Sequence, residues 1–389
     1  MTSTIIPTSP DQVTVEWLIS ILQETHNGKV EVLELFPISE KNGVMSSVFK
    51  AKMKIDEVTI NLFIKTVLDE NDPGRQFGDV FAFGKREILF YKYVFKELVQ
   101  YEKTNCQQSL LEGLIPTFYS GNYSSEHGKC GYYLIMEDLS DEYQLKRHED
   151  GFNKNDCILI LQRLARFHAV SHGFISSNQD LVKSWNLEHS HAKYKSDLQT
   201  KDFFNNYEKI VDFIVKRSPE LKQPLDALKP NWCEVFDKAF FLGDHMETRF
   251  FIHGDFWLNN LLFNSSNCKF IDWEDFTFGN PALDLGFFFG TCLSESNIEE
   301  WMDSLMIEYL DFFEATCNEM NVQSPIERIP FLDYVKNNGM LAMGLSCLLW
   351  FDEASPLLPR MLYTIKRPIE RLPYKSTSVL TSKSELARK

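Results

Sequence analysis

The sequence predicts an α+β protein of two lobes, with an antiparallel sheet and one helix in its N-terminal third and mostly helices in the remainder. Three observations favour this fold class. The chain has 389 residues, which is too long for one small core. Residues 47–67 alternate between apolar and polar side chains in two runs, as paired strands do. Beyond residue 156, apolar side chains recur at helical spacing.

The first predicted hairpin joins strands at 47–55 and 58–67 through the two-residue turn Asp56-Glu57. One face of the second strand carries Val58, Ile60, Leu62 and Ile64, and Lys65 lies on the opposite face. Side chains alternate across a strand, so Lys65 points away from that apolar face. Lys65 is therefore either a solvated lysine or a lysine that faces a cleft.

Glu87 falls within the apolar stripe of the next predicted helix. Its neighbours at helical spacing are Phe83, Phe90, Tyr91 and Val94. A carboxylate on such a face is costly unless it has a cationic partner, and Lys65 is the candidate. The alternative is that Glu87 lies at the edge of the stripe and reaches water.

A change from an apolar strand to a run of polar residues marks the boundary that we expect between the lobes. Residues 131–136 predict a strand, and the polar run 137–142 ends it. The lobes would then cover residues 1–136 and 137–389. The following segments of the second lobe show helical periodicity: 156–171, 202–215, 298–320 and 334–350.

The segment His253-Gly254-Asp255, with Asn260 and Asp272 downstream, carries the strongest chemical signal in the chain. Two short apolar runs flank the turn 264–267, which predicts a second hairpin. A hairpin brings its outer ends together, so Asn260 and Asp272 should lie at one edge, with Asp255 close by. An amide oxygen and a carboxylate suit Mg²⁺. A separate carboxylate beside the metal suits a group that orients a hydroxyl and accepts its proton.

Composition excludes several classes of partner and site. A net charge of −15 argues against nucleic acid as the main partner, because phosphate binding needs clustered Lys and Arg. The eight cysteines form no Cys-x-x-Cys pair, so zinc and redox sites are not indicated. We expect no signal peptide and no membrane span, which makes a reduced, cytoplasmic setting the default.

With these residues, the chain resembles the eukaryotic-type small-molecule kinases, the group of aminoglycoside phosphotransferases and choline kinases. Within that group it looks most similar to the ecdysteroid-kinase-like branch. The resemblance covers about residues 30–289. The motifs that carry it are 251–260 and 270–274, followed by Asp284-Leu285-Gly286, with weaker support from 136–139 and 164–169.

The resemblance implies a bilobal protein-kinase-like fold that binds ATP between its lobes and uses Mg²⁺. It implies the following roles: Asp255 takes the proton of an acceptor hydroxyl, Asn260 and Asp272 hold Mg²⁺, Lys65 contacts the α- and β-phosphates, Glu87 fixes Lys65, and the backbone of Glu137, Asp138 and Leu139 holds the adenine. Phosphoryl transfer needs mainly positioning and charge neutralisation, and each residue type supplies one of these.

The phosphate-binding loop is the part that departs from the pattern. It would lie at residues 42–48, which offer one glycine rather than a glycine-rich run. Gly43, Ser46 and Ser47 are the candidate phosphate contacts. The same residues equally predict a plain β-turn, and the two interpretations stay open.

Several further residues lie next to these motifs. We expect His253 and Asp284 to support the Asp255 loop and His168 to be a satisfied core histidine. Trp257 and Trp273 either wall an acceptor pocket, where they could cage a quaternary ammonium, or pack in the core. Another open choice concerns three acidic residues that either attract a cationic acceptor or form a solvated loop: Asp138, Asp141 and Glu142.

The sequence favours a small-molecule kinase over a protein kinase. Gly254 stands where protein kinases usually carry Arg, and eleven residues between Asp272 and Asp284 leave no room for a long activation loop. We therefore expect an ATP- and Mg²⁺-dependent transfer to a hydroxyl of a small organic molecule. The resemblance suggests a sterol-like alcohol, a xenobiotic or a conjugate as acceptor. The alternatives are a choline or ethanolamine kinase and an inactive kinase-like binding protein.

Overall fold

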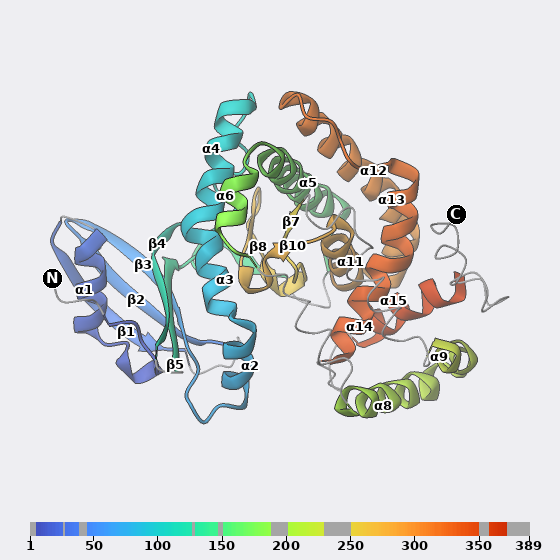
Figure 1. Ribbon diagram of the computed structural model, residues 1–389, viewed down its shortest axis with the longest axis horizontal. Coiled ribbons are helices and arrows are strands. Elements are labelled where there is room, and N and C mark those ends of the chain that lie inside the picture. Colours follow the sequence, from blue (N-terminus) through green and yellow to red (C-terminus); the bar gives the residue numbers. More distant parts are fainter. Residues whose placement is uncertain are drawn as a thin grey trace.

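The computed structural model describes residues 5–25, 28–38, 45–126, 129–146, 151–187, 201–228, 250–349 and 358–371. These residues form two lobes, one built on an antiparallel sheet and one mostly helical (Figure 1). The predicted fold class is confirmed.

The sheet of the first lobe has five antiparallel strands in the order β1-β2-β3-β5-β4. The predicted hairpin is confirmed, with Ile55 opposite Val58 across the turn. Asp56 in that turn adopts a positive φ of 54°. The strands are β1 (Val30–Pro37), β2 (Ser47–Ile55), β3 (Val58–Thr66), β4 (Phe118–Glu126) and β5 (Lys129–Glu137).

The two faces of the sheet are buried by different helices. Helix α1 (Val15–Thr25), which follows the short 3-10 turn η1 (Pro10–Gln12), covers one face and packs on Tyr133 and Ile135 of β5. The intervening residues of β5, Leu134 and Met136, face the main core on the other side. A strand buried on both faces loses the simple apolar–polar alternation that marks an exposed sheet.

A long helical run covers that second face and lies between the sheet and the second lobe (Figure 1). Its segments are α2 (Pro73–Phe81), α3 (Phe83–Leu89), the π-helical turn η2 (Phe90–Val94) and α4 (Phe95–Asn105). The Asp72 side chain caps α2 by accepting the Gly74 amide. Glu87 therefore sits on α3, one turn before η2.

In the second lobe, helix α5 packs along α12 and two small sheets carry the motif region. Asn153 caps α5 by accepting the Asp156 amide, so the helix begins before residue 156. The strands are β6 (Gln144–Leu145), β7 (Phe251–Ile252), β8 (Leu261–Phe263), β9 (Cys268–Phe270) and β10 (Thr277–Phe278). The helices are α5 (Lys154–Ser177), α6 (Gln179–Ser184), α8 (Lys201–Arg217), α9 (Lys222–Leu228), α11 (Pro281–Cys292), α12 (Glu295–Glu319), α13 (Arg328–Tyr334), α14 (Met340–Leu349) and α15 (Leu358–Arg371), with 3-10 turns η3 (Pro219–Leu221), η5 (Leu258–Asn260) and η6 (Trp273–Asp275).

The helix predicted over 334–350 is confirmed through Leu349, and it starts earlier and contains a π-helical turn. Helix α13 ends at Tyr334, the π-helical turn η7 (Val335–Gly339) follows, and α14 begins at Met340. A Cβ added to Gly339 would clash with the carbonyl oxygen of Ala282 on α11. The close approach of two helix backbones therefore accompanies the π-helical turn, and the spacing of apolar side chains does not reveal that turn. Trp350 lies outside the described residues.

An aromatic cluster joins the long helical run to the second lobe. Phe90 of η2 stacks on Trp273 of η6, with ring centroids 3.8 Å apart and planes 13° apart. Phe167 and Phe276 pack edge-on or tilted against the same pair. This core fixes the helix that carries Glu87 against the segment that carries Asp272.

Across the described residues, no helix is both long and apolar enough to cross a bilayer.

We predict that Phe90→Ala destabilises the protein by about 3–5 kcal/mol, because a fully buried ring is removed and a cavity is left. Tyr93→Ala is the matched control, since Tyr93 belongs to the same turn and is 50% exposed. Urea unfolding of both variants measures the difference. Equal midpoints for the two variants would contradict the role assigned to the stack.

Candidate active site

The loop that carries Asp255 is held from beneath by Asp284 on α11. Asp284 is fully buried, and its two carboxylate oxygens accept the amides of His253 and Gly254 at 2.8 and 2.9 Å. The carboxylate also contacts His168 Nε2 at 3.1 Å, and His168 Nδ1 contacts the Tyr309 hydroxyl at 2.8 Å. The expectations that Asp284 anchors the loop and that His168 is a satisfied core histidine are confirmed.

Gly254 is required by the backbone of this loop. Its φ is +86°, a value that side chains rarely tolerate. A Cβ at this position would also collide with the main chain of Asp275. The loop therefore approaches the η6 segment more closely than any residue other than glycine permits.

His253 supports the loop as a neutral ring. Its Nε2 lies 2.9 Å from the Ile271 carbonyl oxygen, and its Nδ1 accepts the Asp255 amide at 3.4 Å. Burial lowers the pKa of His253, although Asp284 and the Ile271 carbonyl oppose the effect. A neutral ring that donates from Nε2 and accepts at Nδ1 satisfies both contacts. The scaffold role expected for His253 is confirmed.

Asp255 and Asn260 form a direct pair. The Asn260 Nδ2 group donates to the Asp255 carbonyl oxygen at 2.8 Å and to its carboxylate at 3.0 Å. The Asn260 Oδ1 atom accepts no hydrogen bond from the described part of the chain. Burial raises the pKa of Asp255 well above its usual range, and the nearby charges of Asp275 and Asp272 add to the effect.

The second predicted hairpin brings Asn260 and Asp272 to one edge of β8 and β9. Leu261 pairs with Phe270, and the Ile271 amide donates to the Asn260 carbonyl oxygen at 3.0 Å. Asp272 follows directly and has φ 64° and ψ 63°, in the left-handed region. Such a conformation costs energy for a residue other than glycine and is often found at functional sites.

Lys65 lies at the centre of a buried ionic cluster. Its Nζ atom is 2.9 Å from Glu87, 2.6 Å from Asp272 and 3.8 Å from Glu274. Glu87 is 1% exposed, so the interpretation that it reaches water is wrong and the predicted Lys65–Glu87 pair is confirmed. Lys65 is therefore buried and not solvated, and it connects the sheet lobe to the Asp272 segment.

The cluster carries more negative charge than Lys65 can neutralise. Burial lowers the pKa of Lys65, but Asp272 and Glu87 outweigh this and raise it well above its usual range. Burial raises the pKa of Glu87 to about 7 against the opposing effect of Lys65. Burial and the charge of Asp272 also raise the pKa of Glu274 well above its usual range. Three carboxyl groups around one ammonium favour the uptake of protons or of a divalent cation.

The oxygen ligands of this region fit Mg²⁺ by their chemistry. Oxygens of Glu87, Asp272 and Glu274 lie within 4.8 Å of one another. The Glu87 Oε1 atom is buried and receives no hydrogen bond from the residues that the structure describes. These carboxylate oxygens are hard ligands of the kind that Mg²⁺ prefers, and the Oδ1 atom of Asn260 is of the same chemical type.

Arg86, Glu274 and Asp275 belong to the site and were missed by the sequence analysis. Arg86 precedes Glu87 on α3 and donates to the Glu274 carbonyl oxygen at 3.2 Å. Burial raises the pKa of Asp275 to about 6, although the Arg86 charge opposes the effect. The signal that could have found them is their adjacency to Glu87 and Asp272.

The side chains of Glu137 and Asp138 hold the segment 137–139 against the sheet lobe. Glu137 accepts the amide and the hydroxyl of Thr117, both at 3.0 Å, and Asp138 pairs with Lys50 at 2.9 Å. Leu139 is buried, and its amide has no acceptor among the residues that the structure describes. The Leu139 amide is thus the polar backbone group of this segment that a ligand could satisfy.

The acidic residues after this segment do not form a free acidic patch. Asp141 accepts a hydrogen bond from Asn61 at 2.9 Å, as Asp138 does from Lys50. Glu142 is exposed. Two of the three carboxylates considered as a cation attractant are therefore already engaged with β2 and β3.

The predicted phosphate loop is only partly described. Gly43 lies outside the described residues. Ser46 is buried, and its hydroxyl lies 2.6 Å from the Tyr132 hydroxyl. Ser47 begins β2 and pairs with Thr66, next to Lys65. Ser46 and Ser47 thus lie near the Lys65 strand, but the Ser46 hydroxyl already has a partner.

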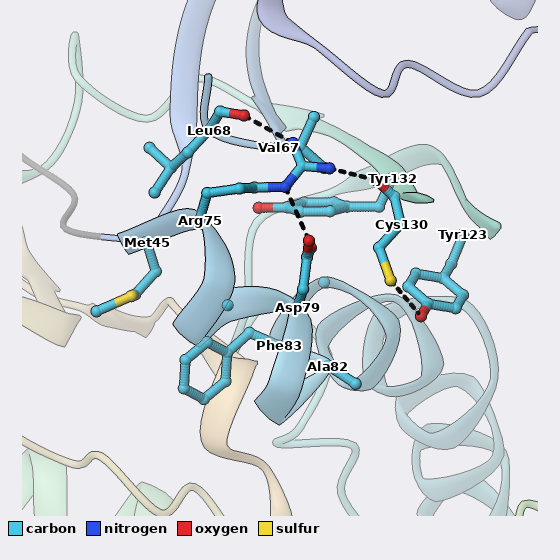
Figure 2. Close-up of a pocket in the computed structure, with 12 residues that line it drawn as sticks. Met45, Val67, Leu68, Arg75, Asp79, Ala82, Phe83, Tyr123, Cys130 and Tyr132 are labelled. Carbon is cyan, nitrogen blue, oxygen red and sulfur yellow. Dashed lines mark hydrogen bonds and ion pairs between the residues drawn. The ribbon is translucent and has the colours of Figure 1, made fainter. Parts of the chain in front are cut away.

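A cavity of about 20 Å³ lies behind Tyr132, and Arg75 of α2 forms part of its wall (Figure 2). Arg75 donates to the carbonyl oxygens of Leu68 and Cys130 at 2.7 and 2.5 Å and pairs with Asp79 at 3.0 Å. The volume suits about one water molecule. This cavity is therefore a gap beneath α2 and not the place of a nucleotide.

The two tryptophans beside the motif have different surroundings. Trp273 is fully buried in the aromatic cluster with Phe90, so it does not wall an acceptor pocket. Trp257 is half-buried and packs against the edge of the main core. The core interpretation is confirmed for Trp273.

Residues 41–322 match the family model described as the ecdysteroid kinase-like family. The match covers more than half of the chain. The chain belongs to the ecdysteroid kinase-like family. The resemblance stated from the sequence is confirmed. No curated protein sequence matches the chain.

Solved structures show the same fold. A choline kinase from Cryptosporidium parvum Iowa II superposes with a TM-score of 0.50 and 13% identity over 92% of this chain and 96% of that chain. An amicoumacin kinase has a TM-score of 0.46 and 11% identity over 86% and 89% of the two chains. A Plasmodium vivax ethanolamine kinase has a TM-score of 0.37 and 12% identity over 87% and 80%. The first similarity shows a kinase-like fold for this family member, and no conclusion depends on the weaker two.

We predict that His253 makes the protein less stable as the pH falls below about 6.5, the usual pKa of histidine. The folded-state pKa is lowered, so the unfolded chain takes up a proton there that the native chain does not. Unfolding in urea from about pH 8 to about pH 5 should show a shallower decline for His253→Gln than for the unaltered protein. Parallel profiles would show that His253 is not held neutral.

Proposed function

We propose that this family member is an ATP- and Mg²⁺-dependent phosphotransferase that acts on a hydroxyl group of a small organic molecule. The observation that carries the proposal is the buried cluster in which Lys65 contacts Glu87 and Asp272. It lies beside a loop that holds Asp255 and Asn260 in a fixed pair. A lysine, a hard-oxygen metal set and a separate carboxylate are the groups that phosphoryl transfer needs.

Each residue then has one chemical task. Lys65 would bind the α- and β-phosphates of ATP, and Glu87 would keep its ammonium oriented. Asn260 Oδ1 and Asp272 would hold Mg²⁺, with Glu274 beside them. When bound, Mg²⁺ supplies neutralisation of the phosphate charge. The Leu139 amide would bind the adenine edge, and Ser46 and Ser47 remain candidates for the phosphate loop.

Asp255 would act as the base. It accepts the proton of the acceptor hydroxyl as the hydroxyl oxygen bonds to the γ-phosphorus and ADP leaves. The raised pKa of Asp255 suits this task, because a carboxylate that holds a proton more firmly is a better base. Asn260 would fix the orientation of the carboxylate through its Nδ2 group.

The acceptor that we propose is a sterol-like alcohol, a xenobiotic or a conjugate. Choline or ethanolamine is the second candidate. It is favoured by the surplus of carboxylate charge around Asp255, to which Asp275 and Asp272 both contribute. The half-buried Trp257 offers an aromatic surface near the same loop.

We predict that Asp272→Ala abolishes Mg²⁺-dependent ATP binding, whereas Asp255→Ala retains it and lowers transfer by at least about 10²-fold, the usual contribution of a general base. Calorimetric titration with ATP, with and without Mg²⁺, measures the first effect. Asp11→Ala is a control, because Asp11 is exposed on η1. ATP affinity that is equal in Asp272→Ala and the unaltered protein would contradict the metal assignment.

The acceptor class is tested by mass spectrometry. The protein is incubated with Mg²⁺-ATP and a panel of sterols, choline, ethanolamine, aminoglycosides and glucosides, with Asp255→Ala as the blank. We expect a product heavier by one phosphoryl group that is absent from the blank. If no panel member reacts and calorimetry finds no Mg²⁺-dependent ATP binding, the protein is an inactive kinase-like binding protein.

A further inference from the structure

Helix α4 ends in a buried ion pair that lies outside the candidate active site. Glu102, in the last turn of α4, accepts a hydrogen bond from Arg166 Nε of α5 at 2.7 Å. The two residues are 0% and 1% exposed. A buried ion pair of this kind is a weak means of adding stability, because desolvation offsets much of the attraction. Its placement therefore calls for an explanation other than stability.

On the α4 side, the Glu102 carboxylate also organises the chain that follows the helix. It accepts the amides of Leu110 and Leu111 at 3.0 and 2.9 Å and the Ser109 hydroxyl at 3.3 Å. The carboxylate is thus saturated with donors, so its position is fixed in one geometry. The loop that leaves α4 is held in the same arrangement.

On the α5 side, the Arg166 guanidinium reaches two further elements. It donates to the Gln108 carbonyl oxygen at 2.6 Å and to Glu319 of α12 at 3.0 Å. Burial lowers the pKa of Arg166, but the hydrogen bond with Glu102 outweighs this and raises it. The guanidinium therefore stays charged and holds α4, its exit loop and α12 together. A planar fork of donors can do this, whereas the single ammonium of a lysine cannot.

The helical run that carries Glu102 and the helix that carries Arg166 both also carry residues of the candidate active site or of its support. Glu102 lies on the helical run that carries Glu87, fifteen residues or roughly 22 Å farther along its axis. Arg166 lies two residues before His168, which contacts Asp284 beneath the Asp255 loop. One helix, α5, therefore contacts the helix of Glu87 and the support of Asp255.

The exit loop of α4 completes the connection. The Leu114 carbonyl oxygen accepts the Phe270 amide at 2.8 Å, and the Ile115 carbonyl oxygen accepts Lys269 Nζ at 3.1 Å. Phe270 is the last residue of β9 and precedes Asp272 by two positions. The Glu102 contacts thus extend to the strand that presents Asp272.

We propose that Glu102 and Arg166 are positioning residues that set how the Glu87-carrying helix lies against the second lobe. The pair fixes the far end of the helix, and the Phe90–Trp273 stack fixes its middle. The distance between the Lys65–Glu87 pair and Asp255 is then determined partly at a point remote from the ligands. The effect on catalysis rests on the proposed function. The positioning of the Glu87-carrying helix by the ion pair does not.

The test uses variants that change one side of the ion pair. Glu102→Gln removes the negative charge that faces Arg166. Arg166→Lys keeps the positive charge but loses the planar set of guanidinium N–H donors. Glu319→Gln is the matched control, because it removes the other carboxylate partner of Arg166 and leaves the Glu102–Arg166 contact unaltered. Hydrogen exchange of peptides spanning residues 83–105, melting temperature, and kcat and KM for ATP are measured for each variant.

We expect faster exchange across residues 83–94 and roughly tenfold lower kcat/KM for ATP in Glu102→Gln and Arg166→Lys, with little change in Glu319→Gln. Unchanged exchange at 83–94, or equal effects in Glu102→Gln and Glu319→Gln, would overturn the inference, as would a loss confined to the melting temperature. If Glu102→Gln fails to fold, Arg166→Lys gives the same comparison. If the unaltered protein neither binds nor uses ATP, the proposed function fails, and the exchange data still decide whether the pair positions the helix.

Discussion

The contact of one lysine with carboxylates from both lobes is the interaction on which the site depends. Lys65 comes from β3 and Glu87 from α3, whereas Asp272 and Glu274 come from the second lobe. One ammonium serves three carboxyl groups, of which Glu87 is buried and the other two are partly exposed, and burial together with the charge of Asp272 raises the pKa values of Glu87 and Glu274. The folded chain therefore carries an energetic cost for ionising these carboxyl groups. A cation and a phosphate-bearing substrate would relieve it, which is the arrangement expected of a site that is completed by its ligands.

Two sets of contacts around this cluster fix the positions of the segments that carry its residues. Asp284 holds the loop of Asp255 through backbone amides, so the loop position depends on α11 and not on exposed side chains. The Phe90–Trp273 stack and the Glu102–Arg166 pair hold the helix of Glu87. Apolar packing and a buried ion pair thus act on the same helix at different points. The site is a product of contacts between lobes that share one continuous hydrophobic core.

Sequence reasoning succeeded where a local pattern determines the geometry. Alternation in 47–67 gave the β2–β3 hairpin, and the turn at 264–267 gave the hairpin that places Asn260 near Asp272. The burial of Glu87 could be inferred because a carboxylate on an apolar helical stripe needs a partner. Prediction from the sequence failed where a contact joins residues that are far apart in the chain. The roles of Arg86 and Arg166 depend on elements far apart in the chain, and the π-helical turn at 335–339 lies where Gly339 packs closely on α11.

The central claim is that the Lys65 cluster is the place where ATP phosphates and Mg²⁺ bind. A crystal structure with Mg²⁺ and a non-hydrolysable ATP analogue tests it most directly. The account predicts a phosphate oxygen next to Lys65 Nζ, metal density bound by Asn260 Oδ1 and Asp272, and the adenine edge at the Leu139 amide. A nucleotide bound elsewhere, or a metal that leaves Asn260 and Asp272 without contact, would contradict the account.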